Sequence, residues 1–322
     1  MILVQNPKTR ALRHNAHRQP PAPHARLKPM TLARVAPVVF VFLWSTGYIG
    51  AKYGLPFAPP FTFLLLRMVL ATLALLLIAR VLKTPFPKNW LELKHAAFAG
   101  VLLHAGYLGA LFTGIHLGIT AGISSIIVNL QPVLVSSLAA KLLGETVTNR
   151  QWFGLVLGFA GVLLVVAEKF LLAAQNPVNP WGIVACVVAL LSSTGGTIYQ
   201  KRFATGIPLV TGTIVQYLAA GLVFLLLALA FEPIRINWTP QFVFALSWFV
   251  LVISLGAILL LMWLIRQTSA SSVSSLFYLV PPLTAIEAYF LFGERLGVAA
   301  LLGLVLCAAA VALVVSAPKA RV

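Results

Sequence analysis

Long apolar blocks separated by short polar turns run through most of the 322-residue chain. A helix needs about 20 apolar residues to cross the hydrocarbon core of a bilayer. Ten blocks approach that length, so the pattern predicts an all-α integral membrane protein built as one bundle. The predicted spans cover residues 34–52, 61–82, 93–115, 119–141, 150–168, 180–200, 208–231, 241–265, 269–292 and 296–316. The boundary near Gly118, between the third and fourth predicted spans, is the least distinct of these boundaries. If these two spans formed one helix, the count would be nine helices.

The two ends of the chain carry a different pattern. Residues 1–33 are rich in basic residues and proline and contain no long apolar run, so we expect a disordered arm on the cytoplasmic side. Residues 317–322 form a short tail that we expect on the same side. The apolar pattern begins just after Met30, which leaves translation from Met1 or from Met30 as open alternatives.

Composition supports lipid as the main solvent of this protein. Hydrophobic residues make up 60% of the chain and charged residues 9%, whereas a soluble domain carries about 25% charged residues. A soluble enzyme or a nucleic-acid-binding domain is therefore excluded for the bulk of the chain. The net charge of +17 comes mainly from basic residues in the arm and the turns, which is typical of cytoplasmic loops and not of nucleic-acid binding. The expected partners are membrane lipid and a small-molecule substrate, with no nucleic acid.

The distribution of lysine and arginine predicts the orientation of the chain. With ten spans and a cytoplasmic N-terminus, eighteen basic residues fall on the cytoplasmic side and four on the opposite side, and Arg67 is left inside a span. Cytoplasmic loops of membrane proteins carry an excess of basic residues. We therefore expect a multi-pass protein with both termini in the cytoplasm.

The chain contains an internal repeat. Residues 120–166 match residues 269–315 at 18 of 47 positions. Within this match, Gly144–Glu145 in the first copy correspond to Gly293–Glu294 in the second. Shared apolar composition alone would produce fewer identities, so the match indicates two related units.

The repeat divides the apolar body into two predicted units, residues 34–168 and residues 178–316, each with five spans. An odd number of spans turns the second unit upside down relative to the first. Inverted repeats of this kind are the organisation that many secondary transporters use for alternating access.

A family resemblance accompanies the repeat. The first-span motif Leu43–Tyr48 (LWSTGY), the paired Gly-Glu motifs and the two five-helix halves resemble the drug/metabolite transporter superfamily of the EamA type, over about residues 34–316. The resemblance implies ten helices, a location in the bacterial inner membrane, and outward movement of small polar metabolites, often amino acids. It also implies a central cavity lined by the first, third, fourth, sixth, eighth and ninth helices.

These observations predict a secondary transporter that exports small polar metabolites or amino acids by alternating access, without a cofactor or a metal. An importer, an uncoupled facilitator and a channel for small solutes remain alternatives. A membrane-embedded enzyme is disfavoured because the chain has no aspartate and only six glutamates, which do not cluster along the sequence. The cargo, the direction of flux, the coupling ion and the oligomeric state stay open at this point.

Prolines occur in two repeat-equivalent spans. Pro132 lies in the fourth predicted span, and Pro281 and Pro282 lie in the ninth. Proline removes a helix hydrogen bond and clashes with the preceding turn, and a freed carbonyl in a membrane needs a protein or water partner. The symmetric positions predict hinges beside a cavity, and the alternative is a pair of packing kinks.

Charged residues in the spans are candidates for a gate or for ion coupling. Arg67 and Glu287 lie within predicted spans and Lys52 closes the first span, all toward the outer side. A charge at the bilayer centre costs about 2.5–3.5 kcal/mol on insertion scales, so it seldom lacks a function. We hypothesise an ion-paired cluster that holds the outer gate shut. Snorkelling of Arg67 and Lys52 to the lipid headgroups is the alternative.

Polar and aromatic residues in the spans are candidates for the substrate site, because aromatic faces with a few placed polar groups suit a zwitterion or a flat metabolite. The candidates are Trp44, Ser45, Thr46, Tyr48, His104, Asn129, Gln131, Trp263 and Tyr278. Glu287 and His104 are also candidates for proton coupling, since a carboxylate or an imidazole can carry the proton. The alternative for His104 is a hydrogen-bonded packing residue.

Small residues predict close packing by the last span of each unit. The fifth span contains Gly154, Gly158 and Gly161, and the tenth contains Gly303 and Cys307. Small residues let helix backbones approach closely in lipid. We expect these two spans to be structural and peripheral, and a homodimer through them is left open.

Overall fold

The computed structural model describes residues 29–119, 124, 127–173, 179–292 and 298–315. Contacts group the chain into Met1–Val35 and Ala36–Val322, and the second group contains nearly all of the helical body. Every regular element in the described ranges is a helix, which agrees with the predicted all-α fold. Most of the predicted arm and the predicted tail lie outside the described residues.

The helices follow the predicted apolar blocks. In chain order they are α1 (Pro29–Gly54), η2 (Leu55–Phe57), α2 (Pro60–Val81), α3 (Trp90–Gly100), η3 (Val101–Gly109), α4 (Ala110–His116), α6 (Gln131–Leu142), α7 (Asn149–Ala173), α8 (Pro180–Phe203), α9 (Leu209–Phe231), α10 (Pro240–Trp248), η4 (Phe249–Ala257), α11 (Ile258–Gln267), α12 (Ala270–Ser275), η5 (Leu276–Leu279), α13 (Val280–Phe292) and α14 (Val298–Val315). Helix α1 begins at Pro29, inside the predicted arm, so the last residues of that arm are helical.

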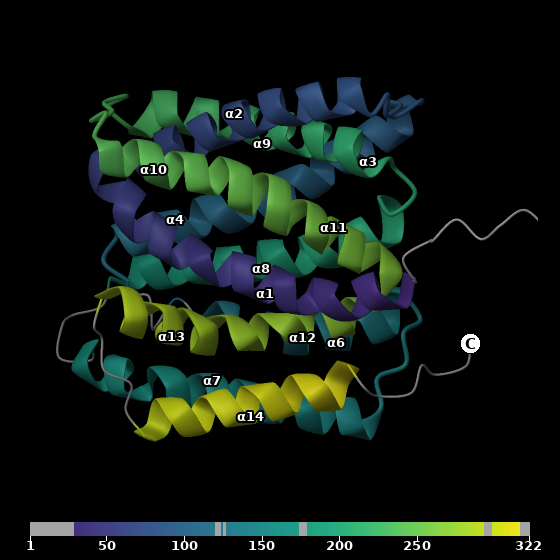
Figure 1. Ribbon diagram of the computed structural model, residues 1–322, viewed down its shortest axis with the longest axis vertical. Helices are drawn as coiled ribbons and strands as arrows, with labels where there is room; N and C mark the ends of the chain where they lie inside the picture. The colour runs from purple at the N-terminus through teal and green to yellow at the C-terminus, as the bar shows by residue number, and fades with distance from the viewer. Residues whose placement is uncertain (1–28, 120–123, 125–126, 174–178, 293–297, 316–322) are drawn as a thin grey trace, which may run out of the picture. The chain divides into compact units, whose positions relative to one another are not determined.

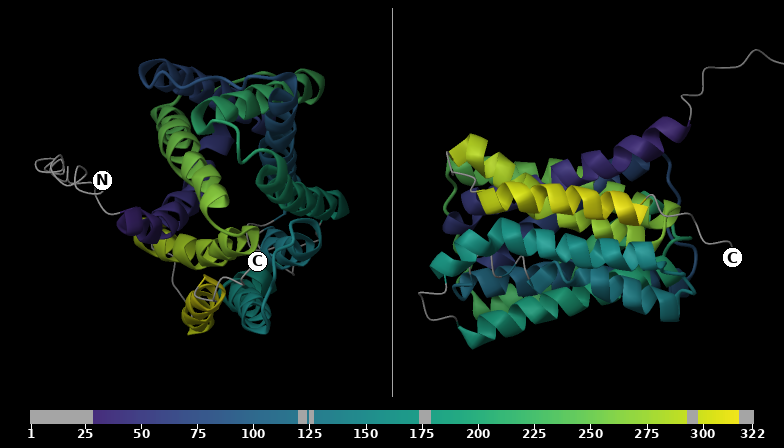
Figure 2. Two further views of the ribbon diagram at one scale, coloured as in Figure 1. Left: turned by 90° about the vertical axis from the view of Figure 1, so that its right-hand side faces the viewer. Right: turned by 90° about the horizontal axis from the view of Figure 1, so that it is seen from below.

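Several of these helices are long and apolar enough to cross a membrane. In the described part of the chain, five helical runs meet that condition: Pro60–Val81, Trp90–His116, Pro180–Phe203, Leu209–Phe231 and Pro240–Gln267. Shorter apolar stretches lie in α1 and α14. The helices of residues 36–322 run side by side, mostly along one common direction (Figure 2). This arrangement suits a bundle that spans a lipid bilayer.

Two of the long runs contain a π-helix at the same place in the sequence repeat. The π-helix η3 lies within Trp90–His116, and the π-helix η4 lies within Pro240–Gln267. Both π-helices have nine residues, and their first residues, Val101 and Phe249, are 148 positions apart. π-helices are rare and are often found at functional sites. Their equivalent positions make these two segments candidates for lining a functional site.

Gly118 separates the third predicted span from the fourth. Its backbone has φ +90°, a conformation that favours glycine, and the N–H of Ile119 donates to the carbonyl of Gly114. This bonding pattern terminates helices by satisfying their last carbonyls, and α4 ends at His116. The least distinct boundary in the sequence pattern therefore corresponds to a helix end.

The fourth and ninth predicted spans are both interrupted just before their prolines. A turn at Asn129–Leu130 precedes α6, and Pro132 lies in the first turn of that helix. The 3₁₀-helix η5 precedes α13, which begins at Val280, so Pro281 and Pro282 also lie in a first helical turn. Proline is tolerated there because the N–H groups of the first turn have no helical partner. Both interruptions give the chain a point where the helix direction can change.

Helices α7 and α14 pack side by side along small residues (Figure 1). A methyl group on Gly161 would lie 2.8 Å from Cys307 Sγ, and one on Gly154 would lie 2.9 Å from a methyl carbon of Val314. The Cys307 thiol also donates to the carbonyl of Gly158 at 3.6 Å. The close approach predicted from these small residues is therefore present. The same chain covers this face of α7.

Helix α9 packs against α2 and α3 on another side of this unit. The closest approach is at Gly100, where a methyl group would lie 2.4 Å from the backbone of Gln216. Glycine is required at such a contact because any side chain would collide with backbone atoms that cannot move aside. This contact fixes the start of η3 against the middle of α9.

Two glutamates hold helix ends that belong to the other predicted unit. Glu145, in the turn between α6 and α7, accepts from the backbone N–H of Ala270 at the start of α12, at 2.8 Å. Glu232, just after α9, accepts from the backbone N–H groups of Phe61 and Thr62 at the start of α2, at 2.7 and 2.8 Å. A carboxylate at a helix N-terminus satisfies free N–H groups and interacts favourably with the helix dipole.

Candidate functional site

A partly open cavity of about 60 Å³ is lined by α1, α2, α4 and the two π-helices. Its lining residues are Trp44, Gly47, Arg67, Tyr107, Leu108, Leu111, Phe112, Ile115, Phe249 and Ile253. The walls are aliphatic and aromatic, and Arg67 is the charged residue among them. Apolar cavities with a few placed polar groups are the usual sites for small organic ligands. We call this space the Arg67 cavity.

Arg67 is almost completely buried in α2, with 1% of its surface exposed. Its Nε donates to Ser254 Oγ of η4 at 2.9 Å, and its guanidinium carbon lies 4.9 Å from the centre of the Phe249 ring. The Tyr217 hydroxyl of α9 donates to the Ser254 carbonyl at 2.8 Å. These contacts partly compensate the loss of hydration of a buried cation. Arg67 is therefore held by η4 and does not extend toward a lipid surface.

The expected ion pair between Arg67 and Glu287 is absent from the described side chains. Glu287 in α13 is half-buried, and its Oε1 accepts from Ser45 Oγ at 2.6 Å. The other oxygen, Oε2, is buried without a hydrogen-bond partner. Thr284 adds a second link to α1, because its hydroxyl donates to the Ser45 carbonyl at 3.3 Å. The pairing fails because Arg67 is turned toward η4, whereas Glu287 is turned toward α1.

A series of buried polar side chains leads away from the Arg67 cavity. The ring of His104 in η3 packs edge-on against the ring of Tyr217, with centres 5.0 Å apart. His104 Nε2 lies 3.2 Å from Gln216 Oε1, and Gln216 Nε2 donates to Gln200 Oε1 at 3.0 Å. Because the Gln216 amide nitrogen donates to Gln200, its oxygen is the acceptor and His104 Nε2 carries the proton. His104 Nδ1 is then an unprotonated nitrogen, and it is buried without a partner.

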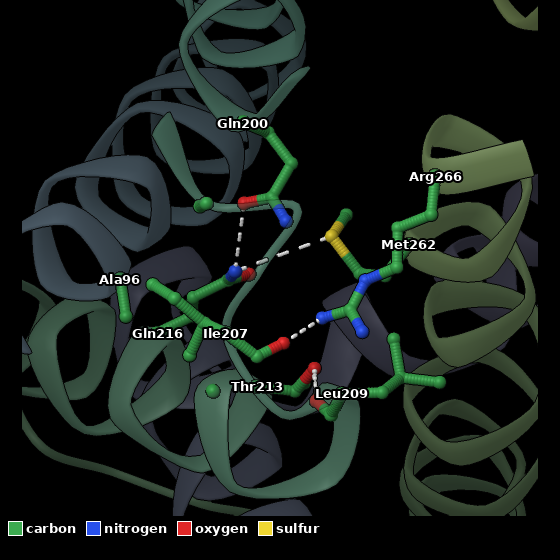
Figure 3. Close-up of a pocket in the computed structure, with 10 residues that line it drawn as sticks. Ala96, Gln200, Ile207, Leu209, Thr213, Gln216, Met262 and Arg266 are labelled. Carbon is green, nitrogen blue, oxygen red and sulfur yellow. Dashed lines mark hydrogen bonds between the residues drawn. The ribbon is translucent and has the colours of Figure 1, made fainter. Parts of the chain in front are cut away.

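The far end of this series borders a closed crevice between helices, which we call the Gln216 crevice (Figure 3). It is lined by Ala96, Gln200, Ala204, Ile207, Leu209, Gly212, Thr213, Gln216, Met262 and Arg266. Figure 3 shows the Gln216 amide between Gln200 and the sulfur of Met262, which lies 4.0 Å away. Arg266 donates from Nη2 to the carbonyl of Ile207 across the crevice. The polar series thus lies between the Arg67 cavity and the Gln216 crevice.

Two predicted residues of the first span contact aromatic side chains. Trp44, which lines the Arg67 cavity, packs edge-on against Phe277 of η5 with ring centres 5.3 Å apart. Thr46 Oγ1 accepts from Trp248 Nε1 of α10 at 2.9 Å. The LWSTGY motif therefore connects α1 to helices of both the eighth and the ninth predicted spans.

Two further predicted residues contribute to packing away from the Arg67 cavity. Gln131 at the start of α6 donates to Thr197 Oγ1 of α8 at 3.2 Å. Tyr278 is completely buried, and its ring covers Gly158 of α7 so closely that a methyl group there would lie 2.4 Å from a ring carbon. The Tyr278 hydroxyl is buried without a hydrogen-bond partner. Neither residue lines the cavity.

The remaining predicted residues also stand apart from the cavity or cannot be placed in full. Asn129 is buried in the turn before α6, and Trp263 is half-buried on α11. Tyr48 and Lys52 belong to α1, but their side chains lie outside the described part of the structure. In the described ranges, no group of three His, Cys or Glu side chains is placed to hold a metal ion.

Three residues that hold the site together, Ser254, Tyr217 and Gln216, are missed by the sequence analysis. Each is a polar residue inside an apolar run, so a signal is present in the sequence. The sequence of one helix does not reveal what these residues contact, because Ser254 bonds to Arg67 and Gln216 bonds to His104, both on other helices.

Family comparison assigns both halves of the chain. The sequence matches the EamA-like transporter family twice, over residues 33–167 and residues 180–316. The chain belongs to this family. The Arg67 cavity is therefore lined by both EamA domains, with Arg67 and Tyr107 from the first and Phe249 from the second.

Relatives of this EamA protein are named as transporters. It is 28% identical over 298 residues to the uncharacterized transporter YvbV of Bacillus subtilis (strain 168), which covers 91% of this chain and 94% of YvbV. It is 27% identical over 257 residues to the uncharacterized inner membrane transporter YedA of Escherichia coli (strain K12), covering 79% of this chain and 81% of YedA. This EamA protein is a multi-pass membrane transporter.

The fold of this EamA protein also occurs in a solved structure. The backbone resembles the crystal structure of a protein with a TM-score of 0.74 and 18% sequence identity, covering 91% of this chain and 99% of the other. At this level of identity, the similarity concerns the fold alone.

Proposed function

We propose that this EamA protein is a secondary transporter of the bacterial inner membrane that exports small polar metabolites by alternating access. Its ten spanning helices form two inverted five-helix repeats, and both termini are cytoplasmic. The double family match and the named inner membrane transporter YedA support transport and location. The excess of basic residues on one side of the predicted spans supports the orientation.

The observation that carries this proposal is the position of the Arg67 cavity between the two EamA domains. In inverted-repeat transporters, the substrate binds where the repeats meet, often beside irregular helices. Both π-helices line this cavity, and each belongs to a different repeat. The cavity also contains a buried charge, which costs too much free energy in a membrane to be retained without a role.

The Arg67 cavity and the Gln216 crevice support alternating access. In the proposed orientation α2 begins on the outer side, and Arg67 lies seven residues after its first residue, Pro60. The Arg67 cavity then belongs to the outer half of the membrane, and the Gln216 crevice belongs to the cytoplasmic half. The contacts among Tyr217, His104 and Gln216 separate the cavity from the crevice. In an inward-open state we expect these contacts to break, which would expose the site to the cytoplasm.

Transport through the Arg67 cavity can be tested with variants of Gly47, a lining residue. A methyl group on Gly47 would meet only Ile253 Cδ1, at 3.7 Å, which is an ordinary contact distance. Gly47→Ala should therefore fold and transport like the wild type. Gly47→Phe should fill the cavity and abolish transport without unfolding the protein.

The measurement is counterflow in proteoliposomes, with a solute chosen by thermal-shift screening of amino acids and small metabolites on the purified protein. Transient accumulation of labelled solute against its gradient identifies a carrier. Downhill leakage without accumulation would instead indicate a channel. Wild-type counterflow by Gly47→Phe would show that the substrate path does not pass through the Arg67 cavity.

A further inference from the structure

We propose that the cargo is a small organic carboxylate with an apolar body, and that its carboxylate binds Arg67. This inference rests on the proposed transport function and deepens it. It adds the charge of the substrate, which the family description and the names of the relatives leave unspecified.

Arg67 has no counter-charge among the carboxylates whose side chains are described. Those carboxylates are engaged elsewhere: Glu92 at the start of α3, Glu145 at the start of α12, Glu232 at the start of α2, and Glu287 on Ser45. The side chains of Glu168 and Glu294 lie outside the described part. A buried charge without a paired opposite charge is strongly unfavourable. An anionic ligand in the cavity would supply the missing charge.

The described contacts of Arg67 use one of the three guanidinium nitrogens. Ser254 uses Nε, and the two Nη nitrogens have no protein acceptor in the described part of the chain. These two nitrogens form a planar fork that fits both oxygens of a carboxylate. Phe249 lies against the guanidinium, and Tyr217 holds Ser254 through its carbonyl. The fork is therefore held in place before a ligand binds.

The walls of the Arg67 cavity favour an anion with an apolar body over a cation or a zwitterion. Apart from Arg67 and Tyr107, the lining side chains are aliphatic or aromatic. No carboxylate of the described residues lines the cavity, so an ammonium group would find no anionic partner there. Arg67 would also repel it, because like charges repel each other.

Ligand binding to the purified full-length protein tests the proposal. The probes are benzoate and propionate, and the uncharged controls are their amides, benzamide and propionamide. In a thermal-shift titration, we expect each acid to stabilise the protein at about tenfold lower concentration than its amide. Benzylamine, which carries the opposite charge on the same ring, should have no effect.

Variants of Arg67 assign this preference to one side chain. Arg67→Gln should abolish the preference for acid over amide. Arg80→Gln changes an exposed arginine on the same helix and should respond like the wild type. Arg67→Lys keeps the charge but loses the fork, so it should bind the acids about tenfold more weakly and still prefer them to the amides. If Arg67→Gln does not fold, the result for Arg67→Lys decides the test.

Two results would overturn the anion site: equal responses to acid and amide in the wild type, or a wild-type response to the acids in either Arg67 variant. Counterflow in proteoliposomes then separates this inference from the transport function. If the protein shows counterflow of a neutral solute but does not prefer acids to amides, the proposed transport function is supported and the proposed anion site is wrong. If the acids bind through Arg67 but neither acid shows counterflow, the proposed anion site is supported and the proposed transport function is contradicted.

Discussion

At the scale of single residues, the structure gives the buried polar groups different tasks. Arg67 is held by Ser254 and lines a cavity, whereas Glu287 bonds to Ser45 and has one oxygen without a partner. In this arrangement Arg67 and Glu287 do not pair with each other. An ion pair between them would have neutralised both.

Glu287→Gln tests a coupling role at the same scale. Glutamine keeps an oxygen that can accept from Ser45 Oγ but removes the charge and the exchangeable proton. If Glu287 carries a coupling proton, the variant should lose transport driven by a pH gradient and keep counterflow, which needs no coupling.

Glu92→Gln is the control, because Glu92 accepts from the backbone N–H of Lys88 near the start of α3, away from the spans' interior. Gradient-driven transport by Glu287→Gln at the wild-type rate would contradict the coupling role. Loss of both activities would instead indicate that Glu287 is needed to bind the cargo or to hold α1 on α13.

At the scale of elements, small residues and irregular helices divide the bundle into rigid and adaptable parts. Helices α7 and α14 meet through glycine and cysteine at distances that leave no room for another methyl group. The π-helices η3 and η4 and the interrupted runs before Pro132 and Pro281 lie in other helices. Irregular backbone in a membrane protein is tolerated where protein or a cavity surrounds it. The α7–α14 pair is closely packed, and the π-helices η3 and η4 line the Arg67 cavity.

Gly161→Ala tests the rigid pair. The added methyl group would lie 2.8 Å from Cys307 Sγ and 2.9 Å from the carbonyl oxygen of Gly303, so the helices must separate. Overpacking of this kind costs about 1–3 kcal/mol, and we expect a lower melting temperature in detergent.

Gly195→Ala is the matched control, because nothing lies within 4 Å of a methyl group at Gly195 in α8. Alanine is favoured over glycine in a helix by about 0.5–1 kcal/mol, so this variant should melt at or above the wild-type temperature. Equal melting temperatures for both variants would show that α7 and α14 do not pack as closely as described.

At the scale of the whole molecule, the two EamA domains hold each other at their helix ends. Glu145 of the first domain caps α12 of the second, and Glu232 of the second caps α2 of the first. In the proposed inverted topology, these two caps lie on opposite sides of the membrane. Each cap can therefore stabilise the closed arrangement on its own side.

Cysteine labelling tests this topology in the intact protein. The native residues Cys186 and Cys307 are both buried, so they should not react with a membrane-impermeant maleimide. Lys141→Cys and Arg235→Cys each add one thiol at an exposed position, the first in the last turn of α6 and the second after α9. We expect the first to be labelled only from the cytoplasmic side and the second only from the outer side. Labelling of both from one side would contradict the inverted repeat.

The sequence alone determined the features that depend on local composition and spacing. The apolar blocks placed the helices, the least distinct boundary proved to be a helix end at Gly118, and small residues indicated the close approach between α7 and α14. These features follow from hydrophobicity and residue size, which are properties of each segment by itself. The family resemblance was confirmed for the same reason, because its motifs and its repeat are written in the sequence.

Only the tertiary structure decided which buried polar groups meet. Arg67 and Glu287 were equally plausible partners from their spans, yet Arg67 bonds to Ser254, 187 residues away, and Glu287 bonds to Ser45. The rotation of each helix about its axis selects such partners, and the π-helices η3 and η4 change that rotation partway along two helices. An apolar span looks alike at every rotation, so its sequence does not reveal which side chain will face the cavity.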